Sequence, residues 1–184
     1  YKNVYKVEQK QNILFYLDKK KLIKNYYHVW PNFSPTVDKL KLKDDFRELI
    51  LDSIRLRMIS DVPLGVFLSG GIDSSMVASM MQSVSNKPID TFSIGFNEKE
   101  YDESSYARSI SNYLNTHHHE LIVDSKMLLD VVTELPNIYD EPFADASGIP
   151  TYILAKMTRN NVTVSLSGDG ADELFGGYER YYKG

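Results

Sequence analysis

The sequence predicts an α/β protein with a doubly wound parallel sheet. Short apolar runs alternate with helix-like stretches from residue 65 onward. The first such unit, GVFLSGGIDSSMVASMM at residues 65–81, passes from an apolar run through a loop of small residues into a helical pattern. Continuous apolar runs are typical of strands buried on both faces, and helices between them make neighbouring strands parallel. Ligands of such sheets bind beyond the carboxyl ends of the strands, so the loops after the apolar runs are the expected place for a site.

The first 34 residues are predicted to form a separate part of the chain. Within residues 1–30, YKNVYKV and ILFYL alternate briefly around a lysine-rich stretch at residues 19–21, which predicts a hairpin or strand pair. We interpret the lysines as a solvated turn rather than a binding patch. The two prolines of WPNFSP favour a linker, and we place the boundary near Ser34. The chain therefore divides into residues 1–34 and 35–184.

The second part is expected to begin with a helix and to continue as alternating strands and helices. Apolar residues recur at helical spacing between Phe46 and Met58, which predicts an amphipathic helix over residues 38–59. Strands are expected at residues 65–68, 89–95, 118–123 and 161–167, and helices at residues 74–83, 103–114, 126–135 and 150–159.

Three adjacent histidines, residues 117–119, invite a zinc site. Neighbouring side chains on a strand point to opposite faces, so three in a row cannot easily converge on one ion. We therefore interpret these histidines as the start of a strand.

Composition excludes several classes of function. The chain has no cysteine, which rules out disulfides, thiolate metal sites and cysteine nucleophiles within it and fits a reducing compartment. Its formal net charge of -4 offers no general attraction to nucleic acid or to anionic membranes. No run approaches the roughly 18 apolar residues of a spanning helix, and the start lacks the apolar segment of a signal peptide. We expect a cytoplasmic protein and, because the chain opens at Tyr1 without a methionine, a piece of a longer one.

The loop after the first buried strand, SGGIDSS at residues 69–75, has the features of a phosphate site. Two consecutive glycines let backbone amides turn toward a ligand, and the following helix offers unpaired N–H groups with partial positive charge. The hydroxyls of Ser69, Ser74 and Ser75 can add donors, while Asp73 is suited to hold magnesium against a phosphate. The alternative is a tight turn in which Asp73 only caps the helix.

The loop resembles a known nucleotide-binding loop. It contains neither GxxxxGK[ST] nor GxGxxG, so it is not a kinase-type or dinucleotide-binding loop. It does resemble the SGGxDS loop of the N-type ATP pyrophosphatases, which have the adenine nucleotide alpha hydrolase-like fold. Members of this family cleave ATP between the α and β phosphates and activate a carboxylate or carbonyl as an adenylate.

A second loop near the other end repeats the pattern. The stretch VTVSLSGDGADELFGGYERY places Asp169, Asp172 and Glu173 among four glycines after an apolar strand. Acidic residues packed in a loop are costly unless a cation balances them, so we favour magnesium binding there over a solvated acidic turn.

The two loops occur in order with TFSIGF, YDESSYA, THHHE and DEPFADASGIPTY, and together they resemble the synthetase domain of glutamine-hydrolysing asparagine synthetase. The resemblance covers residues 1–182 and is densest from Asp61 onward. β-Lactam-forming synthetases share the scaffold, but SGDGADELFGGY is closer to the asparagine enzymes.

The resemblance implies roles for individual residues. Asp73 and Asp172 would share Mg²⁺, and Asp169 would lie beside the acyl-adenylate and take a proton from ammonia. Asp169, Asp73 and Ser69 are thus the expected catalytic residues. ATP would contact the pyrophosphate-binding residues Ser69, Gly70, Gly71, Asp73 and Ser74, and the adenosine-binding residues Leu68, Ile94, Ser167 and Gly168. Leu68 and Ile94 could equally be plain core.

A segment between the two loops carries three further acidic residues. Asp140, Glu141 and Asp145 fall where some family members contact the amino-acid substrate. This segment carries no arginine or lysine, so loop capping is an equal alternative for the three acids.

The implied reaction is the ATP-dependent conversion of aspartate to asparagine through an aspartyl-adenylate, with release of AMP and pyrophosphate. Ammonia would come from a glutaminase domain of the same full-length chain, whose tail or connecting strap would be residues 1–34. A homodimer is left open, and the chain alone is expected to retain partial ATP binding and little complete synthesis. The alternatives are a related adenylating amidotransferase acting on another carboxylate and a non-catalytic nucleotide-binding module.

Overall fold

A computed structural model describes residues 2–18, 21–26, 38–100, 102–141, 145–181 and 183. The chain forms two compact units, Tyr1–Leu42 and Lys43–Gly184. The first holds an antiparallel hairpin of β1 (Gln11–Tyr16) and β2 (Lys21–Tyr26), which confirms the predicted strand pair. The predicted lysine turn lies largely outside the described residues, and the predicted boundary near Ser34 lies wholly outside them.

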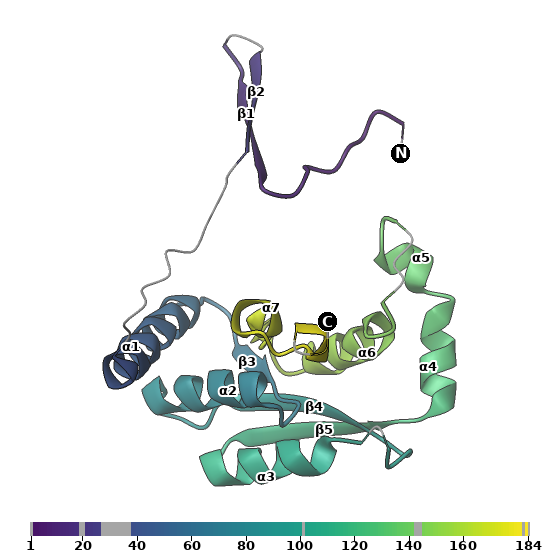
Figure 1. The fold of residues 1–184 in the computed structure, drawn as a ribbon. Coiled ribbons are helices and arrows are strands. Elements are labelled where there is room, and N and C mark those ends of the chain that lie inside the picture. Colours follow the sequence, from purple (N-terminus) through teal and green to yellow (C-terminus); the bar gives the residue numbers. More distant parts are fainter. Residues whose placement is uncertain are drawn as a thin grey trace. The chain divides into compact units, whose positions relative to one another are not determined.

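The second unit is built on a parallel sheet of four strands in the order β5-β4-β3-β6 (Figure 1). Its strands are β3 (Leu64–Phe67), β4 (Asp90–Phe96), β5 (His117–Val123) and β6 (Val164–Leu166). Its helices are α1 (Lys39–Arg57, entering from the first unit), α2 (Ile72–Val84), α3 (Ser104–Leu114), α4 (Ser125–Val132), α5 (Leu135–Ile138), α6 (Gly148–Thr158) and α7 (Ala171–Phe175), followed by a 3-10 turn (Glu179–Tyr181). Among the described residues, no helix is both long enough and apolar enough to span a membrane.

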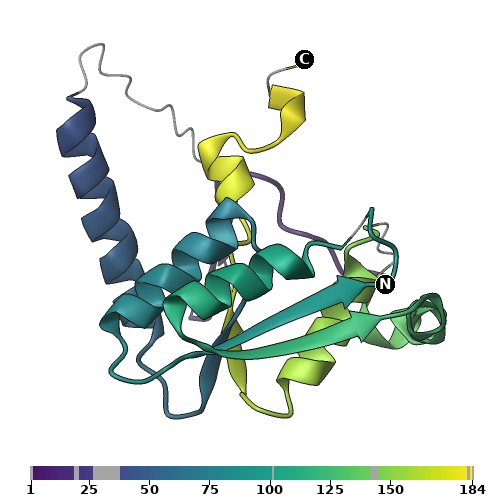
Figure 2. The same ribbon diagram turned by 90° about the horizontal axis from the view of Figure 1, so that it is seen from below.

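Helices cover both faces of this sheet, as predicted for a doubly wound fold. On one face, Val66 of β3 and Leu68 just after it pack with Ala78 of α2 in a core that also takes in α1 and α3. On the other face, Val123 of β5 packs with Ile153 of α6 and with α4. Figure 2 shows α2 and α3 side by side over one face, with α6 behind the strands. These two cores fix the sheet between the helix layers.

The order of the strands reverses at β3. From β3 the chain moves outward through β4 to β5, and it then returns to pair β6 with the other side of β3. The loops that leave β3 and β6 therefore start from neighbouring strands, at the same end of the sheet. Such a reversal is the place where open α/β sheets bind ligands.

Two predicted elements differ from the structure by three residues at one end, while the other elements of the second unit agree within two residues. The predicted helix 126–135 ends at Val132, and the short α5 begins at Leu135 with Pro136 in its first turn, where proline is tolerated. The predicted strand 161–167 starts only at Val164, because the N–H groups of Asn161 and Val162 still donate to Thr158 at the end of α6.

The three histidines form the start of β5, as predicted. The His118 ring bonds to Thr91 and Ser93 on β4, whereas His119 Nε2 lies 2.8 Å from Asp90 Oδ1, and the His119 ring stacks on Phe92. The two rings therefore lie on opposite faces of the sheet.

Candidate functional site

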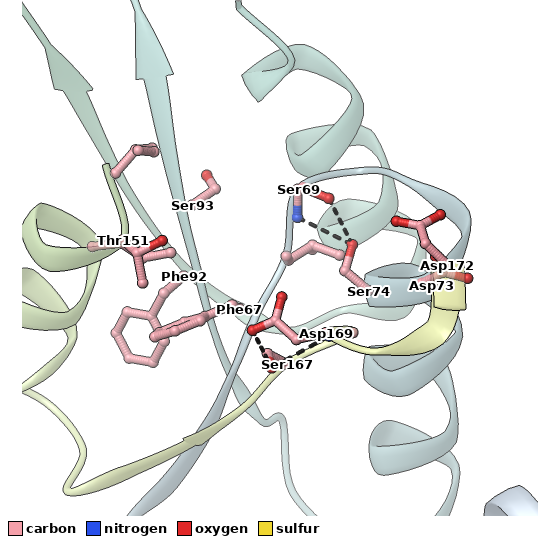
Figure 3. A pocket seen from close by; sticks show the side chains of 14 residues that line it. Phe67, Ser69, Asp73, Ser74, Phe92, Ser93, Thr151, Ser167, Asp169 and Asp172 are labelled. Carbon is pink, nitrogen blue, oxygen red and sulfur yellow. Dashed lines mark hydrogen bonds between the residues drawn. The ribbon is translucent and has the colours of Figure 1, made fainter. Parts of the chain in front are cut away.

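A pocket of about 300 Å³ lies at the strand-order reversal, between the ends of β3 and β6, strand β4 and helix α6 (Figure 3). It brings together most of the residues predicted to bind ATP or magnesium. These are Leu68, Ser69, Asp73, Ser74, Ile94, Ser167, Gly168, Asp169 and Asp172. Gly70 and Gly71 are not among its lining residues but form the turn between Ser69 and α2.

Hydroxyl groups hold the first loop, residues 69–75, against the start of α2. The Oγ atoms of Ser69 and Ser74 share a hydrogen bond of 2.9 Å, and the Ser69 N–H donates to Ser74 Oγ at 3.2 Å. Ser75 Oγ donates to the Gly71 carbonyl at 2.6 Å. The loop is therefore ordered by its own contacts. The hydroxyl of Ser75, predicted as a phosphate donor, is instead engaged with the backbone.

Glycine is required at one position of this loop for two reasons. Gly70 has a φ of 88°, and a Cβ there would lie 2.5 Å from Tyr106 Cβ and 2.7 Å from the Ala107 nitrogen. The loop thus packs directly on the first turn of α3. The cap of α2 is Gly71, with no side-chain hydrogen bond, so the alternative in which Asp73 caps the helix is wrong.

The second loop, residues 167–172, touches the first. A Cβ on Gly168 would lie 2.8 Å from the Ser74 nitrogen, so only glycine lets the two loops approach this closely. Ser167 Oγ donates to Asp169 Oδ2 at 3.0 Å, which fixes that carboxylate at the mouth of the pocket. The structure therefore places the acidic loop beside the glycine-serine loop.

The charges around the pocket suit an anion only if a cation accompanies it. Three aspartates, 73, 169 and 172, are among its described lining residues, which include no lysine or arginine. The described residues contain no group of three or more His, Cys, Asp or Glu side chains arranged to hold a metal. Mg²⁺ is commonly bound through one or two carboxylates together with substrate phosphates and water. Asp73 and Asp172 fit that kind of site.

The three acids of the segment at residues 140–145 are not among the described residues that line the pocket. Asp145 Oδ1 accepts the Ser147 N–H at 2.8 Å just before α6. Hydrogen bonds from Ser147 lower the pKa of Asp145 below its usual value. The geometry thus gives Asp145 the loop-capping role that the sequence left open. Residues 142–144 of this segment lie outside the described part of the chain.

Five residues of the pocket were not predicted from the sequence: Phe67, Phe92, Ser93, Thr151 and Leu154. Thr151 and Leu154 lie three residues apart on α6 and line the pocket from that helix. Their spacing of three marks one helix face, but that pattern alone does not tell which face of the sheet the helix covers.

Ser93 connects the pocket to a buried polar network under α3. The two ring nitrogens of His118 share hydrogen bonds with Thr91 Oγ1 (2.9 Å) and Ser93 Oγ (3.1 Å). Thr91 Oγ1 continues to Thr116, which bonds to Ser111. Burial lowers the pKa of His118, an effect opposed by the nearby Glu120 carboxylate and reinforced by His119 and Arg108. The neutral imidazole, with one donor and one acceptor, matches its two hydroxyl partners.

This network predicts a pH dependence of stability. Because the pKa of His118 is lower in the folded chain than in the unfolded one, the unfolded chain takes up the proton first, and stability falls as the pH drops through about 6.5. Urea unfolding between about pH 8 and pH 5 should therefore show a shallower loss of stability in His118→Gln than in the wild type. His117→Gln, which changes an exposed ring, is the control. Equal slopes in all three proteins would contradict the prediction.

Comparisons with known proteins find similar sequences over most or all of the chain. The profile of the family described as Asparagine synthase matches residues 45–184. A putative glutamine-hydrolysing asparagine synthetase 2 of Methanocaldococcus jannaschii is 45% identical over 185 residues, covering 100% of this chain and 36% of the relative. The glutamine-hydrolysing asparagine synthetase 1 of Bacillus subtilis is 38% identical, covering 97% of this chain and 28% of the relative. The chain thus spans about a third of the length of these relatives.

Among solved structures, an NH3-dependent NAD synthetase from Campylobacter jejuni is similar with a TM-score of 0.48 and 16% sequence identity. The match covers 77% of this chain and 61% of that one.

Proposed function

Because the chain belongs to the asparagine synthase family, we propose that it is the part of a longer enzyme that activates aspartate with ATP and transfers the acyl group to ammonia. One observation carries the proposal. A glycine-serine loop after β3 and an acidic loop after β6 line the same pocket at the strand-order reversal. The first loop suits phosphate, the second suits a cation, and ATP with magnesium requires both.

ATP is proposed to lie along the pocket with its phosphates at the first loop. The N–H groups at the start of α2 are unpaired within the helix and carry partial positive charge, which favours the pyrophosphate. The hydroxyls of Ser69 and Ser74, which share a hydrogen bond, can both turn toward the oxygens of the pyrophosphate. The adenosine would then pack on Leu68 and Ile94, beside the backbone of Ser167 and Gly168.

Asp73 and Asp172 are proposed to hold Mg²⁺. When bound, the ion would offset the charge of the phosphates and of the leaving pyrophosphate. Asp73 lies in the first turn of α2 and Asp172 in the first turn of α7, so each carboxylate is positioned by a helix that begins directly after a glycine.

The proposed chemistry has two steps. The side-chain carboxylate of aspartate attacks the α-phosphorus of ATP, the bond between the α-phosphorus and the α,β-bridging oxygen breaks, and pyrophosphate leaves. The preorganised N–H groups of the first loop stabilise the negative charge that develops on the leaving group. Ammonia then attacks the acyl carbon and AMP leaves, while Asp169 takes the proton released from nitrogen. Ser167 holds the Asp169 carboxylate in place for this transfer.

The partners of the reaction follow from the same proposal. Ammonia would come from a glutaminase domain of the full-length protein, and residues 1–34 would be the tail of that domain or the strap leading from it. A homodimer is compatible with this arrangement. A chain without cysteine fits the reducing cytoplasm, which is the proposed compartment. The chain by itself would bind ATP in part and complete little synthesis.

The carboxylate substrate that ATP activates can be identified by experiment. The pocket's described lining offers no arginine or lysine for the α-carboxylate of aspartate, which keeps a related adenylating amidotransferase with another substrate as the second candidate. We expect the full-length protein to exchange labelled pyrophosphate into ATP when aspartate is present and not with glutamate or succinate. Exchange with a different carboxylate would favour the second candidate, and no exchange with any carboxylate would favour a non-catalytic nucleotide-binding module.

A further inference from the structure

The residues that follow α7 make contacts that the proposed chemistry does not use. Tyr178 Oη donates to Glu173 Oε1 at 2.8 Å. The Arg180 guanidinium lies over the Tyr178 ring, 4.4 Å from its centroid, so the ring is held from its face as well as through its hydroxyl. Glu173 is the neighbour of Asp172, one of the two proposed magnesium ligands. The segment GGYER, residues 176–180, therefore reaches back to the residue beside a ligand.

The same segment contacts Asp172 directly. The N–H groups of Gly176 and Gly177 both donate to the Asp172 carbonyl, the latter at 3.0 Å. The Asp172 carboxylate lies so close to Gly177 that a Cβ at that position would overlap it. Both the backbone and the side chain of Asp172 are thus placed by the turn that follows α7.

Helix α7 needs such outside support because it is only five residues long. Helices this short are not stable by themselves in water. Glycines in the left-handed region flank α7, Gly170 with a φ of 88° and Gly176 with a φ of 70°. Phe175 of α7 also makes an edge-to-face contact with Phe46 of α1, at 5.3 Å between ring centroids. The direction in which Asp172 points therefore depends on contacts made after the helix.

We propose that Tyr178 is a positioning residue: through its hydrogen bond to Glu173, it holds α7 in the orientation that aims Asp172 at the magnesium site of the pocket. Tyr178 is not among the described residues that line the pocket, so it acts through Glu173. In this arrangement Glu173 accepts the hydrogen bond from Tyr178 and is not a third metal ligand. The inference rests on the proposed function only for the identity of the metal site.

The first test removes the hydroxyl. In Tyr178→Phe the Mg²⁺ concentration for half-maximal pyrophosphate exchange by the full-length protein should rise about tenfold, as expected for one lost hydrogen bond to a carboxylate. Saturating Mg²⁺ should restore the rate to within about twofold, because the bound ion reorders the loop. The matched control is Tyr181→Phe. The Tyr181 ring lies 5.8 Å from that of Tyr178, and its hydroxyl has no hydrogen bond within the described part of the chain. The Tyr181→Phe control should need the same Mg²⁺ concentration as the wild type for half-maximal exchange.

Variants of the acceptor separate positioning from ligation. Glu173→Gln keeps an oxygen that can accept from Tyr178 and should stay within about threefold of wild type, whereas Glu173→Ala should match Tyr178→Phe. The double variant Tyr178→Phe with Glu173→Ala should be no worse than either single change. The proposal is overturned if Tyr178→Phe behaves like Tyr181→Phe, or if Glu173→Gln is as damaging as Glu173→Ala. If Tyr178→Phe does not fold, Glu173→Ala removes the same bond from the other side.

A binding measurement separates this inference from the proposed reaction. Mn²⁺ can replace Mg²⁺ as a probe, and its affinity in the presence of ATP can be measured by electron paramagnetic resonance without turnover. A wild type that catalyses no exchange but binds Mn²⁺ more tightly than Tyr178→Phe would reject the reaction and keep the positioning role. A wild type that catalyses exchange, with the same Mn²⁺ affinity in both proteins, would reject the positioning role alone. A wild type that binds no Mn²⁺ with ATP present would reject both.

Discussion

Asp73→Asn in the full-length protein is expected to lower the rate of aspartate-dependent pyrophosphate exchange by about 10²–10³-fold, the size of effect seen when one preorganised charge-stabilising group is lost. Asp73 lines the pocket from the first turn of α2, and the N-cap of that helix is Gly71. Asparagine keeps the size of the side chain and removes the charge that would hold Mg²⁺. The loss should fall on exchange and on the Mg²⁺ requirement while the thermal midpoint stays close to that of the wild type.

A carboxylate outside the pocket provides the control for Asp73. Asp52 is exposed on α1, and Asp52→Asn should leave both the exchange rate and the Mg²⁺ requirement unchanged. If Asp73→Asn kept the wild-type rate and Mg²⁺ requirement, the assignment of Asp73 as a metal-holding residue would be wrong.

Gly70→Ala is expected to destabilise the fold by about 2–5 kcal/mol, the sum of a strained φ and an overpacked contact. The added methyl group would meet Tyr106 Cβ and the Ala107 nitrogen, and a backbone nitrogen in a helix cannot move aside as a flexible side chain can. The first loop would be pushed off α3 or α3 off the sheet. Urea unfolding, followed by circular dichroism, measures the loss.

Gly170→Ala is the matched control for Gly70→Ala. Gly170 has the same φ of 88°, but no atom lies within 4 Å of its Cβ position. Gly170→Ala should therefore lower the free energy of unfolding only by the cost of the left-handed backbone, about 1–2 kcal/mol. Equal losses in the two variants would contradict the close packing of the first loop on α3.

Local pattern was enough to predict most elements of the fold and both loops of the site. An apolar run, SGGIDSS and a helical pattern follow one another within seventeen residues. In the structure they form β3, the first loop and α2. The end of α4 was misplaced because apolar spacing continues past Val132, whereas the chain turns there and starts α5 around Pro136.

The pairing of β3 with β6 was not contained in any local pattern. About a hundred residues separate Asp73 from Asp172, and only the resemblance to asparagine synthetases predicted that they would share one site. In the structure the contact is made possible by Gly168, whose missing side chain lets the acidic loop approach Ser74. Thr151 and Leu154 were missed for a related reason, since helical spacing does not tell which strand end a helix face will cover.

The central claim is that this pocket makes an acyl-adenylate, and transfer of oxygen from substrate to AMP tests it most directly. The full-length protein would be incubated with ATP, ammonia and aspartate labelled with ¹⁸O in its side-chain carboxylate, and the products analysed by mass spectrometry. Attack of that carboxylate on the α-phosphorus predicts one ¹⁸O atom in AMP for each asparagine formed. Label in inorganic phosphate with ADP as the other product would instead show attack at the γ-phosphorus and would contradict the account.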